Sequence, residues 1–269
     1  MHELNEEKIR QEKIKNFLAN GVYPYPAACV RLQTVSEAKK IGEKQNVILA
    51  GRLISKREMG RLIFSHLKDE TGKMQLAFSE KELGKENFKF FIKNYDVGDF
   101  IQASGEIFIT HKGEISVLVK KYNILTKTIL PLPEKFHGLA DIEIRYRQRY
   151  LDLLANEESV KIAYLRSNLI KEIRKYFDFR GFYEVETPIL QTLYGGALAK
   201  PFITRHNALN ITLYLRVAPE LYLKRLIIGG FEKVYEIARC FRNEGIDNNH
   251  NPEFTQIEFY WAYANYNDL

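Results

Sequence analysis

The order of strand-like and helical segments between residues 46 and 126 restricts the fold of this chain more than any other feature. Five segments have the apolar pattern of strands: 47–54, 62–67, 74–78, 100–110 and 114–125. Between the third and the fourth, residues 80–94 change to helical spacing, with Leu83, Phe88 and Ile92 as the apolar positions. Three strands, one helix and two strands make the order of an OB-fold, a five-stranded barrel that commonly binds nucleic acids.

A charged segment precedes this barrel and a proline-containing segment follows it. Residues 3–19 are expected to form a helix that Asn20-Gly21 ends, and its lysines are expected to face solvent rather than nucleic acid. Pro131 and Pro133 interrupt the strand pattern, so residues 127–150 are interpreted as a linker. The linker ends in alternating arginines and aromatic residues, a pattern that fits a phosphate backbone and arginines satisfied by carboxylates equally well.

The remaining residues, 151–269, combine helical and strand patterns. Helices are expected near 165–177 and 219–228, and strands at 182–186, 233–240 and 255–264. The last two strands flank a polar loop and are expected to pair as an antiparallel hairpin, with Glu258 and Tyr260 on one face. The chain is therefore predicted to be α+β, with a helical extension (1–45), an OB barrel (46–126), the linker, and a second domain over 151–269.

Composition and charge limit the partners and the cellular compartments that are possible for the protein. The net charge of +6 and the pI near 9.0 are compatible with a polyanionic partner but do not identify one. Cys29 and Cys240 lie far apart without metal-ligand spacing, which favours two free thiols in a reducing compartment. The N-terminus has no apolar signal segment, and no apolar run is long enough for a membrane span. A cytoplasmic protein without membrane contact is expected.

The residues with the most chemical content surround the loop of the C-terminal hairpin. Residues 239–245, 250–255 and 258–260 combine two arginines, a phenylalanine, carboxylates and a tyrosine. Cations, an aromatic plate and carboxylates that face one cavity would suit a ligand with phosphate, base and ammonium groups. Spacing alone, however, favours an ordinary hairpin with charged surface residues.

Several segments resemble the class II lysyl-tRNA synthetases. Phe241-Arg242-Asn243-Glu244 with residues 250–254 resembles motif 2 of class II synthetases, and residues 181–190 resemble motif 1. The lysyl members are matched by four further segments: 195–202, 215–225, 136–139 and 145–153. The similarity runs from about residue 3 to the last residue, and it implies an OB-fold anticodon-binding barrel followed by the first part of an antiparallel-sheet catalytic domain.

The resemblance implies ATP-dependent activation of lysine to lysyl-adenylate and transfer of lysine to tRNA(Lys). Arg242 would be the catalytic residue that holds the α-phosphate and the lysine carboxylate, and Phe254 would stack on adenine. The implied ATP-binding residues are Arg242, Glu244, His250, Asn251 and Phe254. The implied lysine-binding residues are Gly196, Glu220, Arg242, Glu258 and Tyr260, with Glu258 and Tyr260 at the ε-ammonium. Glu220 as a helix-start residue and His250 as a loop hydrogen-bonder are the structural alternatives.

The same resemblance implies an anticodon pocket on the barrel. Phe64 would stack on a base, Gln75 and Glu114 would read base edges, and Arg57 would be the nearby cation. The alternative for Phe64 is a place in the core of the barrel.

The sequence differs from the family in one respect: no counterpart of its third motif is found. The acidic residues that hold Mg²⁺ in the lysyl enzymes would also lie beyond residue 269, so no metal ligand is assigned, although ATP and Mg²⁺ are expected by family. The chain by itself is expected not to activate lysine at a useful rate. A homodimer is expected by family. The alternatives are a non-catalytic tRNA-binding fragment and an aspartyl- or asparaginyl-tRNA synthetase.

Overall fold

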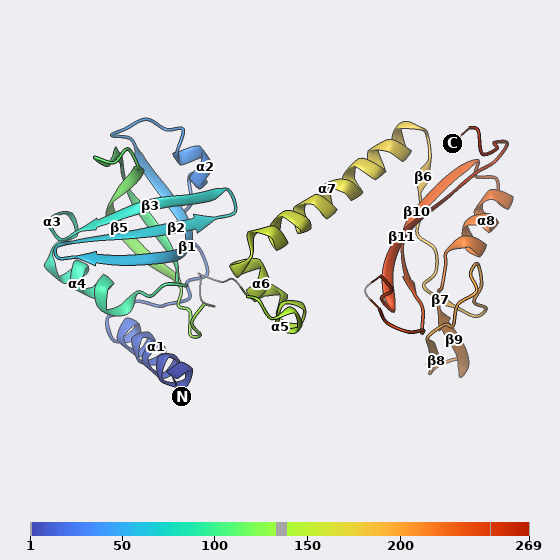
Figure 1. Ribbon diagram of the computed structural model, residues 1–269, viewed down its shortest axis with the longest axis horizontal. Helices are drawn as coiled ribbons and strands as arrows, with labels where there is room; N and C mark the ends of the chain where they lie inside the picture. Colours follow the sequence, from blue (N-terminus) through green and yellow to red (C-terminus); the bar gives the residue numbers. More distant parts are fainter. Residues whose placement is uncertain (1, 133–138, 248, 269) are drawn as a thin grey trace. The chain divides into compact units, whose positions relative to one another are not determined.

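The computed structural model of the chain describes residues 2–132, 139–247 and 249–268, with side chains from residue 5 onward. These residues form two compact units, 1–156 and 157–269, each of which is described by itself (Figure 1). Pro133 and the Phe136-His137-Gly138 part of the linker motif lie outside the described residues. None of the helices in the described ranges is long and apolar enough to cross a membrane.

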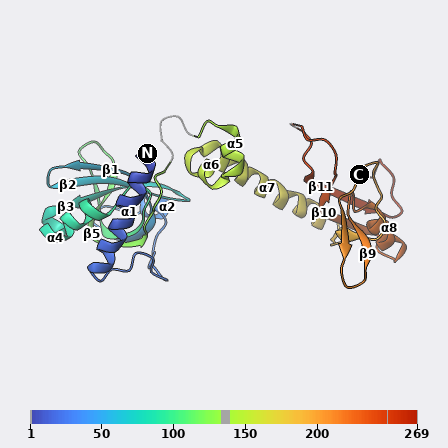
Figure 2. The ribbon, with the colours of Figure 1, turned by 90° about the horizontal axis from the view of Figure 1, so that it is seen from below.

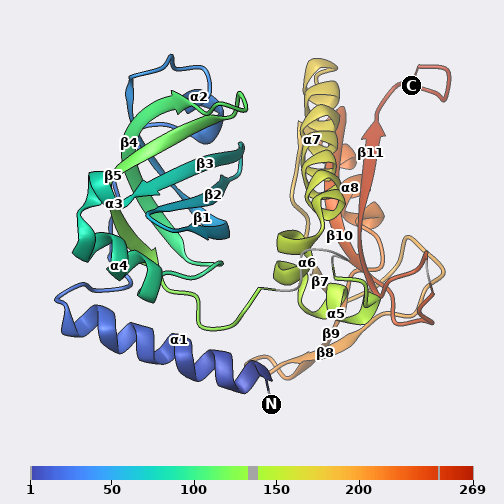
Figure 3. The same cartoon turned by 60° about the vertical axis from the view of Figure 1, so that its left-hand side comes forward.

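The first unit contains a closed five-stranded barrel (Figures 1 and 3). Its strands, in order around the barrel, are β1 (Asn46–Met59), β2 (Leu62–Asp69), β3 (Gly72–Ser79), β5 (Ile115–Thr126) and β4 (Phe100–Ile109). All neighbours pair antiparallel except β3 and β5, which run parallel. The OB-fold prediction is confirmed.

Alternating side chains fill the inside of the barrel, as the strand pattern predicts. On β2, for example, Ile63, Ser65 and Leu67 are fully buried, while Phe64 and His66 between them are partly exposed. Gly105 lies where β4 approaches β5 most closely, at a register shift in their pairing. A Cβ atom built at this position would lie 2.0 Å from the carbonyl oxygen of Leu118. A glycine is therefore required for the two strands to approach so closely.

Two short helices, α3 (Glu80–Leu83) and α4 (Lys85–Asn94), follow β3, and the latter covers part of the barrel core with aromatic rings. Phe91 of α4 stacks between Phe78 of β3 and Tyr95, with ring centroids 3.9 and 4.9 Å apart. Helix α1 (His2–Ala19) lies beside α4 (Figures 1 and 2) and inserts Phe17, which is fully buried, against Tyr95. The helix ends before Gly21, whose φ of +70° suits a helix C-terminus.

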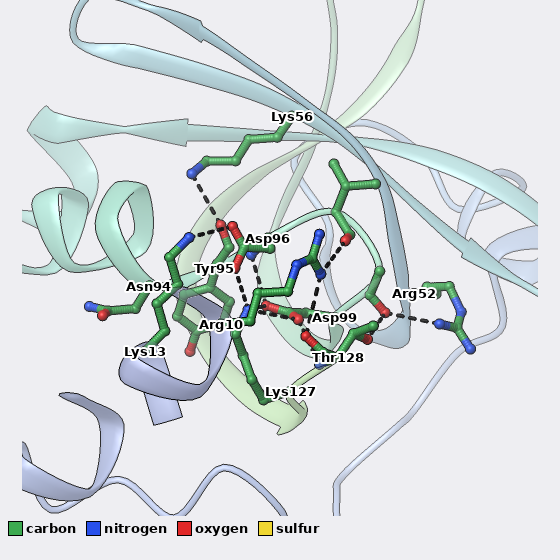
Figure 4. A network of polar contacts seen from close by, with 12 residues as sticks. Arg10, Lys13, Arg52, Lys56, Asn94, Tyr95, Asp96, Asp99, Lys127 and Thr128 are labelled. Atoms are coloured by element: carbon green, nitrogen blue, oxygen red, sulfur yellow. Dashed lines mark hydrogen bonds and ion pairs between the residues drawn. The ribbon is translucent and has the colours of Figure 1, made fainter. Parts of the chain in front are cut away.

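A network of charged groups ties α1 to the barrel (Figure 4). Lys127 Nζ is fully buried and lies 2.8 Å from Asp99 and 2.6 Å from Asp96, which also accepts a hydrogen bond from Lys13 of α1. Burial raises the pKa of Asp99. At Asp96 burial acts in the same direction, but Lys127 and Lys13 outweigh it and lower the pKa. The expectation that the α1 lysines all face solvent is wrong for Lys13, because its carboxylate partner is 83 residues away in sequence.

The segment interpreted as a linker contains helix α5 (Ile142–Arg147) and the start of α6 (Arg149–Ala155). The arginines at its end are engaged within the first unit: Arg145 Nε and Arg149 donate to the buried carboxylate of Asp152 over 2.7 and 2.6 Å. Of the two roles considered for these arginines, the structure shows pairing with a carboxylate.

The second unit is built on helix α7 (Glu157–Phe179) and a three-stranded sheet in the order β11-β10-β6. Strands β10 (Lys233–Phe241) and β11 (Glu253–Trp261) form the expected antiparallel hairpin, and β6 (Tyr183–Glu184) pairs parallel with β10. Helix α8 (Glu220–Ile228) packs against both long strands. A second small sheet contains β7 (Leu190–Gln191), β9 (Ile211–Leu215) and β8 (Ile203–His206).

The two faces of the β10–β11 hairpin differ in character. On one face, Tyr235 stacks on Phe177 of α7 with a centroid distance of 4.8 Å, and Phe259 packs beside them. This aromatic core uses the odd-numbered residues of both strands. The even-numbered residues, including Glu258 and Tyr260, therefore lie on the other face.

Candidate functional site

The register of the hairpin brings the main candidate residues to one face. Glu258 lies opposite Glu236, and Phe254 lies opposite Cys240. The backbone N–H of Arg242 donates to Pro252 O over 2.9 Å and continues this ladder into the loop. Arg242, Phe254, Glu258 and Tyr260 therefore lie on the same side of the sheet, as the period of two requires.

The guanidinium of Arg242 is placed to receive an anion. It lies 4.9 Å from the ring centroid of Phe254, so the two groups form a cation–π pair. Its Nε is buried and has no hydrogen-bond partner. A buried donor without an acceptor destabilises the folded state, and an oxyanion that accepted a hydrogen bond from this Nε would remove the destabilisation.

Glu258 is held by neutral donors. Tyr260 Oη donates to its Oε1 over 2.6 Å and Gln256 Nε2 to its Oε2 over 3.2 Å. Burial, and then the hydrogen bond to Glu258, raise the pKa of the Tyr260 hydroxyl. Among the described residues, Glu258 has no cationic partner within ion-pair distance. Its negative charge is therefore available to a cationic ligand.

Gly196 and the start of α8 lie against each other beside this face. Gly196 has a φ of +87°, and a Cβ atom built on it would lie 2.8 Å from Glu220 Cβ. The carboxylate of Glu220 pairs with Lys224 over 2.5 Å, and its charge adds to the rise in the Tyr260 pKa, so Glu220 and Tyr260 are close. Glu220 is also an acidic residue in the first turn of α8, where its charge stabilises the helix. The structure is thus compatible with both the helix-start role and the ligand-binding role.

The candidate residues of the β10–β11 loop contact different parts of the protein. Glu244 accepts a hydrogen bond from the backbone N–H of Lys200, and Asn243 donates to the oxygen of the same residue. His250 Nδ1 lies 2.8 Å from a carboxylate oxygen of Asp247 and is exposed, which is the arrangement of a loop hydrogen-bonder. Asn251 is exposed. The structure thus ties Glu244 to the 195–202 segment and ties His250 to its own loop.

A buried ion pair on the same face of the sheet as Glu258 was not found from the sequence. Arg216 follows β9 and is 3% exposed, and it pairs with Glu236, which is 4% exposed, over 2.5 Å. The two residues are 20 positions apart on different elements, so no local pattern connects them. The only sequence signal is that Glu236 stands among apolar residues of a buried strand.

A second candidate site is a cavity of about 620 Å³ on the barrel, lined by residues of β1, β2, β3 and the β4–β5 loop. All four residues expected at the anticodon line it: Arg57, Phe64, Gln75 and Glu114. Phe64 is partly exposed between the buried Ile63 and Ser65, so its side chain lies outside the barrel core. The core alternative for Phe64 is wrong.

Hydrogen bonds fix the polar wall of this cavity. Gln75 Nε2 donates to Glu114 over 2.7 Å, and Ser116 Oγ donates to Gln75 Oε1 over 2.8 Å. His66 Nε2 lies 3.2 Å from Glu114, and its Nδ1 lies 2.8 Å from Ser55 Oγ. Ser55, His66 and Ser116 were not found from the sequence, although His66 is two positions after Phe64 and hence on the same face.

No group of three or more His, Cys, Asp or Glu residues able to hold a metal ion is found in the part of the chain that the structure describes. The chemistry that these residues offer is thus anion binding at Arg242, cation binding at Glu258, and base stacking with hydrogen bonding at the barrel cavity.

Comparisons with known proteins identify the families that the two parts of the chain match. Residues 141–269 match the family model of class II tRNA synthetases (D, K and N), and residues 47–125 match the OB-fold nucleic acid binding domain. A lysine–tRNA ligase of Carboxydothermus hydrogenoformans is 51% identical over 99% of this chain and 55% of the relative. One from Aquifex aeolicus is 57% identical over 83% of this chain and 37% of the relative.

A third relative, the lysine–tRNA ligase of Syntrophomonas wolfei, is 51% identical over 96% of this chain and 53% of its own length. The chain spans about half the length, or less, of these curated relatives. The two family models cover the barrel and the synthetase region in the order that the sequence motifs suggested. The chain therefore belongs to the class II tRNA synthetases of the D, K and N group, with an OB-fold nucleic acid binding domain ahead of the synthetase region.

Proposed function

We propose that this chain supplies the anticodon-binding barrel and the lysine- and adenylate-binding face of a lysine–tRNA ligase. The observation that carries the proposal is the pair formed by Arg242, a guanidinium with an unsatisfied Nε, and Glu258, a carboxylate without a cationic partner among the described residues. Both lie on one face of the β10–β11 hairpin. An anion and a cation on one ligand are what an aminoacyl-adenylate of lysine carries.

In the proposed reaction, the carboxylate of lysine attacks the α-phosphorus of ATP and displaces pyrophosphate. The acyl group of the adenylate then passes to the terminal ribose of tRNA(Lys), and AMP is released. Arg242 holds the α-phosphate and the lysine carboxylate, because its planar fork can donate two hydrogen bonds to an oxyanion. Phe254, which already stacks with Arg242, takes adenine on its ring. Catalysis of this kind works through positioning and charge stabilisation and needs no protein nucleophile.

The other residues complete the two substrate sites. Glu258 and Tyr260 receive the ε-ammonium of lysine, and Gly196 and Glu220 lie at its α-amino group. Glu244, His250 and Asn251 line the nucleotide site. Mg²⁺, when bound, would neutralise phosphate charge, but none of the residues described forms a ligand set for it, and no step is assigned through it.

On the barrel, Phe64 stacks on an anticodon base of tRNA(Lys). Gln75 and Glu114 bind base edges, and Arg57 contacts the backbone. The closed barrel, the 620 Å³ cavity and the hydrogen-bonded wall support this assignment. A homodimer and a cytoplasmic location are part of the same proposal, and the two free cysteines are consistent with a reducing compartment.

Binding of non-hydrolysable aminoacyl-adenylate analogues to the chain tests the proposed substrate. The lysyl analogue should bind, and the aspartyl and asparaginyl analogues should bind at least about tenfold more weakly, because Glu258 attracts a cation. Glu258→Gln should remove this preference. Glu253→Gln is the matched control, since Glu253 is on the same strand, on the opposite face, and exposed. Preference for the aspartyl or asparaginyl analogue would refute the proposal.

A second function, tRNA binding without catalysis, is favoured by the completeness of the barrel. Lysine-dependent exchange between ATP and pyrophosphate, measured alongside tRNA(Lys) binding, separates the two. Binding of tRNA without binding of the lysyl analogue would leave only the second function. Exchange at the rate of a complete ligase would contradict the expectation that this chain alone does not activate lysine.

A further inference from the structure

A buried polar cluster of the second unit surrounds Glu236, the residue opposite Glu258 in the β10–β11 hairpin. Arg216 donates from one terminal nitrogen to Glu236 Oε1 over 2.5 Å and to both oxygens of Thr187 over 3.1 Å. Its Nε donates to Arg239 O over 2.8 Å. Thr187 Oγ1 donates to the second oxygen of Glu236 over 2.6 Å. Both oxygens of Glu236 are thus satisfied, and its charge is balanced by one guanidinium.

The position of Glu236 makes that balance important. Glu236 on β10 is the direct cross-strand partner of Glu258 on β11, on the same face of the sheet. Side chains in such positions have Cβ atoms about 5 Å apart, and two like charges there repel each other. Glu236 is paired with Arg216, whereas Glu258 accepts hydrogen bonds only from the neutral donors of Tyr260 and Gln256.

The other titratable groups described near Glu258 do not balance the charge of Glu236. Burial raises the pKa of the Cys240 thiol to about 11, so this neighbour is neutral. Lys224 is engaged with Glu220, and the guanidinium of Arg242 lies over Phe254. Arg216 is therefore the cation that cancels the charge of Glu236 without engaging Glu258.

We infer that Arg216 is a positioning residue for lysine recognition: by neutralising and orienting Glu236, it leaves one net negative charge, that of Glu258, facing the substrate side chain. This inference rests on the proposed function, since it takes the ε-ammonium of lysine as the ligand of Glu258. Arg216 acts through the electrostatics of Glu236 and does not itself touch the substrate.

Charge selectivity tests this role. The affinity of the chain is measured for two non-hydrolysable adenylate analogues, lysyl and norleucyl, which differ in the terminal ammonium. Arg216→Met leaves Glu236 beside Glu258 without a counter-charge, so the two carboxylates share one proton and Glu258 no longer presents its full charge to the ammonium. The preference for lysyl over norleucyl should fall by about tenfold. Affinity for ATP alone, a ligand without the ammonium, should change by less than about twofold.

The double variant Arg216→Met/Glu236→Met removes both charges and keeps the volume. It should regain the parent's selectivity to within about threefold, because replacing both members of a buried pair by apolar residues is well tolerated. This variant also decides the matter if Arg216→Met alone does not fold. Arg239→Met, a half-exposed arginine whose partner Glu253 lies on the opposite face, is the matched control and should keep the parent's selectivity.

The outcomes separate this inference from the proposed function. If the parent chain binds lysyl better than norleucyl and either Arg216→Met keeps the full preference or the double variant fails to regain it, the role of Arg216 is wrong and the lysine site stands. If the parent chain shows no such preference, the lysine site itself is wrong, and the role of Arg216 falls with it.

Discussion

Three carboxylates illustrate how the partner of a residue decides its role. Glu236 is buried and paired with a guanidinium, so its charge is used inside the protein. Glu258 accepts only from a hydroxyl and an amide, so its charge remains for a ligand. Glu114 accepts from Gln75 and lies beside His66, yet half of its side chain is exposed in the barrel cavity. The residue type alone does not distinguish these three roles.

At the same scale, Phe64 provides a direct test of the barrel cavity. Phe64→Ala should weaken binding of tRNA(Lys) by about 1–3 kcal/mol, since it removes the ring that we propose as the stacking platform for a base. Phe64→Tyr keeps a ring and serves as the control. Filter binding or fluorescence anisotropy with the chain would measure both. Equal affinity of the alanine variant and the parent would exclude Phe64 from the tRNA interface, because the side chain is not part of the barrel core.

At the scale of elements, the OB barrel could be predicted because each strand carries its own alternation and β3 is separated from β4 by a clear helical segment. The same period of two placed Glu258 and Tyr260 on one face, and the register of the hairpin adds Arg242 to it. Strands β8 and β9 were missed since they are short, and all residues of β8 are exposed; Ile203, for instance, is 67% exposed. Contacts such as Lys13–Asp96 and Arg216–Glu236 join distant residues, so no local pattern predicts them.

The β2–β3 turn gives a prediction at this scale. The carboxylate of Asp69 accepts from the backbone N–H groups of Thr71 and Gly72 in the turn, and from Val35 at the start of helix α2 (Val35–Ala38). Arg31 pairs with the same group over 2.5 Å. Burial alone would raise the pKa of Asp69, but the hydrogen bonds from Val35 and Thr71 and the charge of Arg31 outweigh it and lower the pKa. The ionised form therefore stabilises the turn.

Asp69→Asn should lower the free energy of unfolding by about 1–2 kcal/mol near neutral pH. Because the folded pKa lies below the ordinary value of 3.8, the unfolded chain takes up the proton first as the pH falls. The stabilisation is thus complete above about pH 5 and is lost as the pH falls through the folded pKa. Urea unfolding from pH 7 to pH 3 would measure it. Glu12→Gln, at an exposed surface pair, should show no comparable effect, and a pH-independent difference for Asp69→Asn would contradict this explanation.

At the scale of the whole molecule, the two units differ in how they are stabilised. The first has a continuous core that extends from Phe17 through all five barrel strands. In the second, the described core cluster consists of Phe177, Phe182 and Tyr235 with partly buried neighbours. Large apolar side chains of this unit, such as Leu165 and Phe179 of α7, are exposed. The second unit therefore has less buried apolar surface to stabilise it.

Unfolding of the chain should accordingly occur in two steps, with the second unit losing structure at a lower denaturant concentration than the barrel. Hydrogen exchange measured by mass spectrometry should show slower exchange in β1–β5 than in β10 and β11. Asp69→Asn should lower the denaturant concentration at which the barrel unfolds and leave that of the second unit unchanged. If β1–β5 and β10–β11 were equally protected from hydrogen exchange and lost that protection in a single transition, the two units would not have independent stabilities.

The parallel pairing of β3 with β5 has a consequence for the protein while it is being synthesised. Gln75 lines the barrel cavity and accepts a hydrogen bond from the buried Ser116, 41 residues away, and the residues between them must leave the ribosome before the two can pair. A nascent chain that ends at β3 displays Phe64 and Gln75 on an open meander, without Glu114 opposite them. A ligand that needs both Gln75 and Glu114 can therefore bind only once the last barrel strand has emerged.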